Sequence, residues 1–119
     1  MILVDTSVWI EHFRSGTVGL ETVLDEGNVA CHPFIIGELA CGTLKNRTEI
    51  LTLLKHLPVA AVANDDEVLM FIEGRQLMGK GLGYIDIHLL MSALLTGIPL
   101  WTFNKRLHEL ATSLLPPPH

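Results

Sequence analysis

Four polar residues stand where strongly apolar segments begin or end. Asp5 ends the run MILV, Glu38 lies within PFIIGELACG, Asp86 lies near the start of YIDIHLLMSALL, and Asn104 follows IPLWTF. No Lys or Arg is an evident buried partner for the three acids. Two carboxylates about 4 Å apart repel each other by roughly 4 kcal/mol at an effective dielectric near 20, so clustered acids either take up protons or bind a cation.

The ligand chemistry of such a cluster favours hard divalent cations. Carboxylate oxygens select Mg²⁺ or Mn²⁺, and Mg²⁺ typically keeps several waters and accepts phosphate oxygens from a substrate. An ion held in this way orients and acidifies a water, neutralises charge on the reacting phosphate, and stabilises the leaving oxygen. If the acids converge in space, the chemistry they favour is cleavage of phosphodiester bonds.

Each position also has a purely structural interpretation. Asp5 could cap the helix that follows it, and Asn104 could cap the last helix of the chain. Asp86 could be an acid in a first helical turn, where the helix dipole favours it by about 0.3 to 1 kcal/mol. The residues alone leave both interpretations open at each position.

Alternating strand and helix patterns are what would bring these residues together. Strands that alternate with helices predict right-handed crossovers and a parallel sheet with helices on both faces, where ligands gather at the carboxyl ends of the strands. Asn64 with Glu67 has capping-box spacing, and Gly42 and Gly97 lie where helices commonly end. The predicted strands cover 1–5, 29–31, 58–62 and 98–102, and the predicted helices cover 6–14, 17–26, 33–43, 47–57, 65–79, 85–96 and 105–113.

Length and composition bound the class of protein. With 119 residues, of which 49% are hydrophobic, we expect one domain over 1–115 and a Pro-rich tail over 116–119. The apolar runs are shorter than the roughly 20 residues of a membrane span, and no basic segment precedes them, so we expect a cytoplasmic protein without membrane contact. Cys31 and Cys41 fit no zinc or redox pattern, which favours buried free thiols.

The formal net charge of −5 argues against a broad electrostatic grip on nucleic acid. It does not exclude a nuclease, because cations bound in an acidic pocket present a positive face to phosphate. Three basic pairs could each face a nucleic-acid backbone, with solvated surface as the alternative. They are Lys45 with Arg47, Arg75 with Lys80, and Lys105 with Arg106.

Four motifs together resemble a known family. VDTSVWI at the start, GELACG, YIDIHLLMSAL, and LWTFNKRL near the end are similar to the motifs of the PIN-domain ribonucleases, specifically the VapC-like toxins of prokaryotic toxin–antitoxin pairs. The resemblance runs over nearly the whole chain, in order and at the expected spacing. Each motif alone is a weak signal, but four in register in a chain of this length are fairly specific.

The resemblance implies both a fold and an activity. The fold is α/β, a three-layer α/β/α sandwich with a short, mainly parallel central sheet. The activity is that of an endoribonuclease dependent on Mg²⁺ or Mn²⁺, and the expected substrate is single-stranded or looped RNA, such as a loop of tRNA or ribosomal RNA. The resemblance also implies a homodimer and a cognate VapB-like antitoxin whose C-terminal segment covers the acidic cleft.

The resemblance assigns roles by motif position. Asp5, Glu38 and Asp86 match the metal-binding acids of the family. Small hydroxyl residues stand beside them at Thr6 and Thr102, where they are expected to orient water or to support the ligands. We expect Asp5→Asn to abolish cleavage and leave the fold intact.

Asn104 departs from the most common pattern, because many members carry a fourth Asp at this position. The exchange removes one charge, so we expect one firmly held metal ion in the free protein and a second ion only with substrate. Asn104 keeps an amide for a water or phosphate, or a carbonyl oxygen for an ion. An alternative function is therefore a protein with weak or no catalysis that binds its antitoxin and thereby regulates its own operon.

The remaining motifs favour other interpretations. VDTSV is superficially similar to the aspartate-nucleophile phosphatases of the haloacid dehalogenase type, which need a second Asp where Ser7 stands. GKGLG (79–83) lacks the context of a phosphate loop and is predicted to be a flexible loop bordering the cleft, from which Lys80 could reach RNA backbone. Surface positions or partner contacts are expected for the histidines on predicted helices, His12, His56, His88 and His108.

Overall fold

Three short parallel strands form the centre of the computed structural model, which describes residues 1–17 and 19–117. In the order β2-β1-β3, strand β1 (Ile2–Val4) pairs with β2 (Val29–Ala30) on one side and with β3 (Leu100–Trp101) on the other. Leu3 and Val4 have no exposed surface, so both faces of β1 are covered. The predicted parallel sheet is therefore confirmed.

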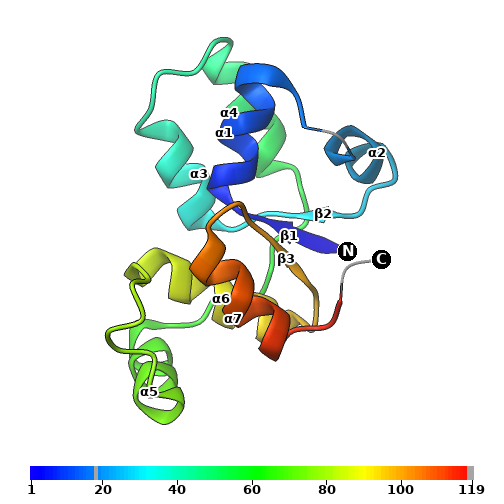
Figure 1. The fold of residues 1–119 in the computed structure, drawn as a ribbon. Helices are drawn as coiled ribbons and strands as arrows, with labels where there is room; N and C mark the ends of the chain where they lie inside the picture. The colour runs from blue at the N-terminus through cyan, green and yellow to red at the C-terminus, as the bar shows by residue number, and fades with distance from the viewer. Residues whose placement is uncertain (18, 118–119) are drawn as a thin grey trace.

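Helices cover both faces of this sheet (Figure 1). On one side lie α1 (Thr6–Ser15), α3 (Pro33–Ala40) and α4 (Arg47–Lys55), and on the other lie α6 (Tyr84–Thr96) and α7 (Lys105–Leu114). Helix α5 (Asp65–Arg75) packs against the outside of α6, and α2 (Leu20–Asp25) lies at the side of the sheet near β2. This is the α/β/α arrangement that the resemblance implied.

Aliphatic side chains fill both interfaces between the sheet and its helices. Burying one such side chain contributes about 1.5 to 3 kcal/mol, so packing rather than the short strand ladder holds the layers together. A smaller cluster fastens α5 to α6 and consists of Ala63, Val68, Leu77 and Ile87. The main core includes Leu3, Val8, Ile35, Leu89, Leu90 and Leu107, none of which has exposed surface.

The predicted strand over 58–62 is wrong. Its only pairing is an isolated parallel bridge between Val59 and Cys31, in which the Cys31 N–H donates to the Pro58 carbonyl at 2.8 Å. The physical reason lies in the partner segment, because only two residues separate β2 from α3, and the second of them, His32, is the N-cap of α3. Val59 is accordingly 62% exposed.

Some predicted boundaries and burial states also differ. Helix α5 ends at Arg75 rather than 79, because Gln76 adopts a left-handed conformation with φ of 52°. Helix α3 ends at Ala40 rather than 43, and Cys41, predicted to be buried, is an exposed residue at its C-terminus. Cys31 is buried as predicted. Gly97 ends α6 in the expected left-handed conformation.

The predictions on membrane contact and on domain boundaries can be compared with the structure only over residues 1–17 and 19–117. No helix within residues 1–17 and 19–117 is both long and apolar enough to cross a membrane. The division into a domain over 1–115 and a tail over 116–119 stays a prediction, since residues 118 and 119 lie outside the described residues.

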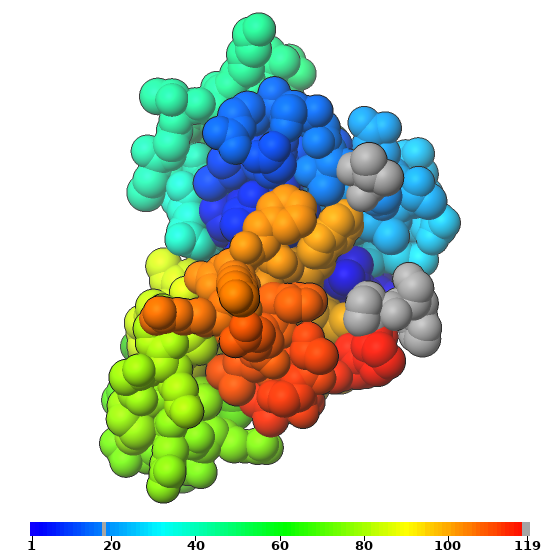
Figure 2. All heavy atoms as spheres, viewed as in Figure 1, coloured from blue at the N-terminus to red at the C-terminus, as the bar shows by residue number. Residues whose placement is uncertain are grey.

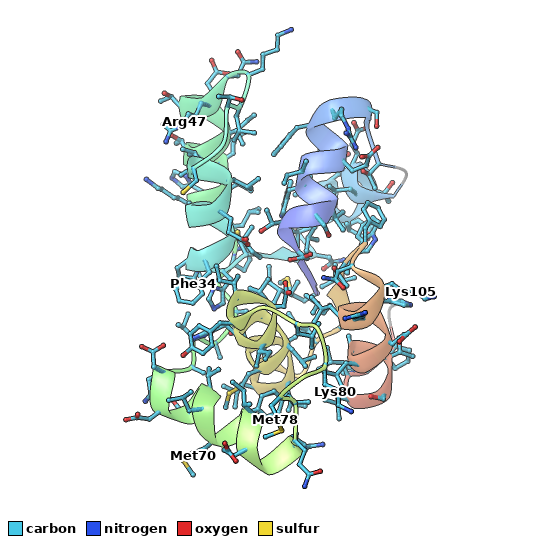
Figure 3. The ribbon with its side chains drawn as sticks, turned by 60° about the vertical axis from the view of Figure 1, so that its left-hand side comes forward. Phe34, Arg47, Met70, Met78, Lys80 and Lys105 are labelled. Carbon is cyan, nitrogen blue, oxygen red and sulfur yellow. The ribbon has the colours of Figure 1, made fainter. Side chains whose placement is uncertain are left out.

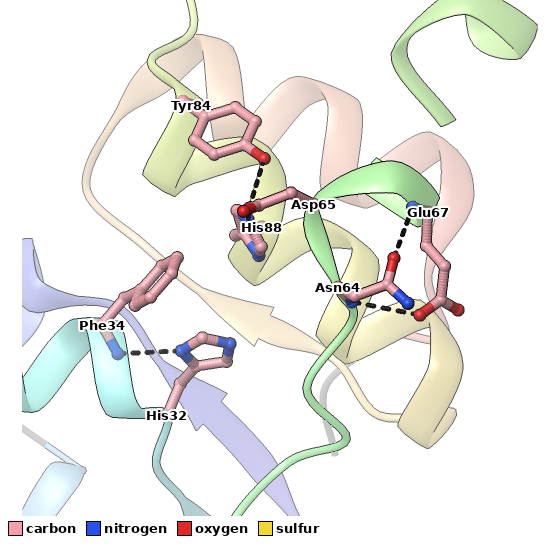
Figure 4. Close-up of polar contacts among 7 residues, drawn as sticks. All are labelled: His32, Phe34, Asn64, Asp65, Glu67, Tyr84 and His88. Carbon is pink, nitrogen blue, oxygen red and sulfur yellow. Dashed lines mark hydrogen bonds and ion pairs between the residues drawn. The ribbon is translucent and has the colours of Figure 1, made fainter. Parts of the chain in front are cut away.

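A group of polar and aromatic side chains around the buried His32 and His88 joins α3, α5 and α6 (Figure 4). His88 was expected at the surface or at a partner contact, yet it is only 1% exposed, and its Nε2 lies 3.3 Å from an Asp65 carboxylate oxygen that also accepts the Tyr84 hydroxyl at 2.7 Å. Phe34 packs edge to face on His88, with ring centroids 4.6 Å apart. Asp65 follows Asn64, which forms the predicted capping box at the start of α5.

His32 is the N-cap of α3 and lies fully buried in this group. Its Nδ1 accepts the Phe34 N–H at 3.0 Å, so the imidazole must be neutral at that nitrogen. Burial, with a smaller contribution from His88, lowers the pKa of His32 from 6.5 to about 4. The start of α3, which carries Glu38, therefore depends on an unprotonated histidine.

A His32→Asn variant tests this dependence. Wild-type His32 is neutral when folded but titrates near 6.5 when unfolded, so the free energy of unfolding should fall as the pH drops from about 6.5 to about 4, by up to ~1.4 kcal/mol per pH unit. Asn accepts the same capping hydrogen bond and does not titrate. Urea unfolding between these pH values should show a shallower slope for the variant, and equal slopes would contradict the assignment.

Candidate active site

The parallel pairing of β1 with β3 places Asp5 beside Thr102. The Asp5 N–H continues the strand ladder by donating to the Trp101 carbonyl at 2.8 Å. The Thr102 hydroxyl donates to Asp5 Oδ2 at 2.8 Å, and both side chains are 5% exposed. A carboxylate buried to this degree needs donors, and the first comes from a residue 97 positions away.

Ser7 supplies two more donors to the same oxygen. Its hydroxyl donates to Asp5 Oδ2 at 2.7 Å, and its backbone N–H lies 3.4 Å from that oxygen, which makes Asp5 the N-cap of α1. The Ser7 hydroxyl also accepts the Phe103 N–H at 3.0 Å. Sequence analysis did not assign Ser7 to the site; its place two residues after Asp5, where an N-cap carboxylate reaches, was the available signal.

Glu38 reaches the site through Thr6. The Thr6 hydroxyl, 8% exposed, donates to Glu38 Oε1 at 2.7 Å and so links α1 to α3. Although Glu38 lies within a largely apolar helix, it is exposed. Ile35 and Leu39 occupy the buried face of α3, and Glu38 lies beside that face with the Thr6 hydroxyl as its partner.

Asp86 lies in the first turn of α6 and is half-buried. Its Oδ2 accepts the Gly83 N–H at 3.1 Å, which satisfies the helix N-terminus. Burial raises the pKa of Asp86 above its ordinary value, the Gly83 hydrogen bond opposes this shift, and the negative charge of Asp5 adds to it. Repulsion between the Asp5 and Asp86 charges therefore contributes to the raised pKa of Asp86, after the larger effect of burial.

Asn104 is both a cap and a neighbour of the acids. Its side-chain oxygen accepts the Leu107 N–H at 3.2 Å and caps α7, as the structural interpretation predicted. Its own N–H donates to the Thr102 hydroxyl at 3.0 Å, so the residue adjoins the Asp5 site. Because the cap occupies its oxygen, the Asn104 amide NH₂ is the group left to face a ligand.

The three carboxylates share one feature. Each has one oxygen held by a protein donor, namely Asp5 Oδ2, Glu38 Oε1 and Asp86 Oδ2, while no hydrogen bond among residues 1–17 and 19–117 uses the other oxygen. No salt bridge of the described residues involves these acids. This donor set, three hard oxygens with no cationic partner, fits a divalent cation. Within those residues, however, no group of three His, Cys, Asp or Glu side chains is arranged so that it could hold a metal ion as it stands.

The chain is similar to known proteins over most of its length. The model of the PIN domain family matches residues 2–112. Ribonuclease VapC32 of Mycobacterium tuberculosis, in strains CDC 1551 / Oshkosh and ATCC 25618 / H37Rv, is 49% identical over 108 residues, which are 90% of this chain and 87% of that protein. The chain therefore belongs to the PIN-domain family, among the VapC-like ribonuclease toxins.

Proposed function

We propose that this chain is a metal-dependent endoribonuclease that hydrolyses RNA phosphodiester bonds as the toxin of a toxin–antitoxin pair. The observation that carries the proposal concerns Asp5. Its Oδ2 accepts hydrogen bonds from Thr102 and Ser7, and its negative charge contributes to the raised pKa of Asp86. Two acids that repel each other in a partly buried site store an electrostatic cost that a divalent cation removes. The matching relative is itself named a ribonuclease.

Asp5, Glu38 and Asp86 are the residues that would hold the metal, with Mg²⁺ or Mn²⁺ as the ions suited to oxygen ligands. Such an ion supplies an acidified water and neutralises charge on the phosphate. Asn104 in place of a fourth acid favours one firmly held ion. A phosphatase of the haloacid dehalogenase type requires a general acid where Ser7 stands. Ser7 instead donates its hydroxyl to Asp5 and does not supply that acid.

The chain's own polar groups orient the acids and the substrate. Thr102 and Thr6 donate to Asp5 and Glu38, which fixes the direction of each carboxylate. The Asn104 amide is placed to donate to a phosphate oxygen near Asp5. We propose single-stranded or looped RNA as the substrate, with loops of tRNA or ribosomal RNA as candidates, because base edges are accessible there. We propose that the protein acts in the cytoplasm, where such RNA occurs.

A groove beside Glu38 supports an antitoxin partner. It has a volume of about 700 Å³ and lies between α1 and the α3–α4 segment, with Phe13, Leu39, Leu44 and Ile50 among its apolar walls and Glu38 at its margin. We propose that the C-terminal segment of a VapB-like antitoxin lies here and covers the acids. A homodimer, which the family resemblance implies, completes the proposed assembly.

A catalytically weak, antitoxin-binding protein is the second candidate. The observation that favours it is Asn104, whose oxygen is engaged in capping α7 and whose side chain carries no charge. Metal binding separates the two candidates, since a nuclease needs the ion and a binding protein does not.

Replacing Asp5 by Asn should abolish cleavage. Asn keeps an oxygen for the Thr102 and Ser7 donors but removes the charge, and we expect at least about a 100-fold loss, because even outer partners of metal ligands are worth 10- to 100-fold. Total cellular RNA incubated with Mn²⁺ or with chelator, followed by mapping of the cut ends, measures this. Discrete cuts by the Asp5→Asn variant at the wild-type rate would refute the site.

Replacing Asp86 by Asn should stabilise the metal-free protein. A carboxyl whose pKa is raised in the folded state costs stability at neutral pH, where it is ionised, and Asn removes this cost while still accepting the Gly83 N–H. In chelator, the thermal unfolding midpoint of the variant should be higher than that of the wild type. A lower midpoint would show that Asp86 is stabilised rather than strained by its surroundings.

Mn²⁺ should raise the unfolding temperature of the wild type but not of the Asp5→Asn variant. An ion present at 100 times its Kd stabilises the folded state by about 2.7 kcal/mol. Differential scanning fluorimetry across a Mn²⁺ titration measures the shift. No shift of the wild type at millimolar Mn²⁺ would favour the antitoxin-binding candidate.

A further inference from the structure

Phe103 is an exposed aromatic residue fastened to the acidic site. Its side chain is 53% exposed and packs into neither of the two hydrophobic clusters of the described residues. Its backbone N–H donates to the Ser7 hydroxyl at 3.0 Å, and that hydroxyl donates to Asp5 at 2.7 Å. The backbone of Phe103 is therefore tied to the candidate catalytic acid through Ser7, while its ring does not contribute to the core.

The surroundings of this ring leave it accessible. Trp101 meets it at 85° with centroids 6.5 Å apart, and no other aromatic pair of residues 1–17 and 19–117 includes Phe103. Figure 2 shows the orange segment that follows β3 on the outer surface, between α1 and α7. The exposed phenyl ring therefore offers a flat apolar face to a ligand.

Arg106, three residues further on, is a cation without an acidic partner among the described residues. The Arg47 guanidinium donates to the Ala40 carbonyl at 2.9 Å, and Arg75 lies in the last turn of α5, where the helix dipole favours a cation. Arg106 and Lys105 instead occupy the first turn of α7, where the dipole opposes them. Neither forms a salt bridge with any described residue.

The Arg106 side chain lies against Gly81 in the loop before α6. A Cβ atom at Gly81 would lie 2.8 Å from Arg106 Cζ and 3.0 Å from its Cδ, and Gly81 has a φ of +76°. The guanidinium therefore lies against Gly81, whose left-handed backbone conformation favours glycine, and the flexibility of this loop stays a prediction. Figure 3 shows Lys80 of this loop on the same side of the molecule as Lys105.

We propose that Phe103 and Arg106 form an RNA-positioning surface, in which the Phe103 ring stacks on a base and the Arg106 guanidinium contacts a backbone phosphate near the cut. The inference rests on the proposed nuclease function and names the residues that hold its substrate. Single-stranded nucleic acid alternates flat bases with negative phosphates, and an exposed aromatic ring three residues from a cation offers a partner to each. Neither residue is a metal ligand, so both are positioning residues.

The test is steady-state cleavage, with Mn²⁺, of a synthetic single-stranded RNA that spans a cut mapped in total cellular RNA. Base–aromatic stacking predicts that Phe103→Ala raises KM about 5- to 150-fold with little change in kcat, and that Phe103→Trp restores it. Met70→Ala, at a residue 74% exposed on α5, is the matched control and should change neither value.

The cation is tested by salt dependence. The slope of log kcat/KM against log salt concentration should be negative for the wild type. Arg106→Gln should make this slope less negative by about 0.7, the value for one phosphate contact on a single strand, and Arg106→Lys should leave it unchanged. Gly81→Ala should reproduce part of the Arg106→Gln effect, because its Cβ displaces the guanidinium.

Each outcome has a distinct meaning. If the wild type does not cleave RNA in Mn²⁺, the proposed function fails and this inference fails with it. If the wild type cleaves and the Phe103→Ala and Arg106→Gln variants keep its KM and salt slope, only this inference is overturned. It is also overturned if Phe103→Ala loses activity together with a change from dimer to monomer in size-exclusion chromatography, because the ring then belongs to a contact between copies.

Discussion

The pairing of β1 with β3 is the constraint on which the rest of the structure depends. Its register sets Leu3 opposite Leu100 and Val4 opposite Trp101, and the next residue on each strand is then Asp5 or Thr102. A slip of one residue would turn every side chain to the other face of the sheet. Because β1 is covered on both faces, burial of its aliphatic side chains fixes the register, and with it the hydrogen bond that orients the Asp5 carboxylate.

The structural and functional interpretations of the site residues turn out to be compatible. Asp5 caps α1, Asp86 accepts an N–H at the start of α6, and Asn104 caps α7. The unpaired N–H groups at a helix N-terminus donate to one oxygen of a carboxylate, and the helix dipole favours its negative charge. Both effects offset the repulsion from a second carboxylate nearby. The other oxygen stays free of protein hydrogen bonds, so a cap and a metal ligand can be the same residue.

Much of the fold could be predicted because its signals are local. The capping box of Asn64 and Glu67 and the strand–turn–helix around Asp5 each depend on a few neighbouring residues. The features that sequence analysis missed depend on distant partners. His88 is buried because Asp65 and Tyr84 meet it there, and the strand over 58–62 fails because its partner segment ends too soon. The candidate acids came from motifs, but their exposure and hydrogen bonds are tertiary properties that no motif encodes.

The order of the strands along the chain also governs when the site comes into being. β1 is made first, but it receives β3 and Thr102 only from the C-terminal end of the sequence. During synthesis, N-terminal segments fold before later ones are available. A nascent chain thus carries Asp5 and Ser7 before Thr102 has been made, so the Asp5 carboxylate gains its second hydroxyl donor only after β3 has left the ribosome.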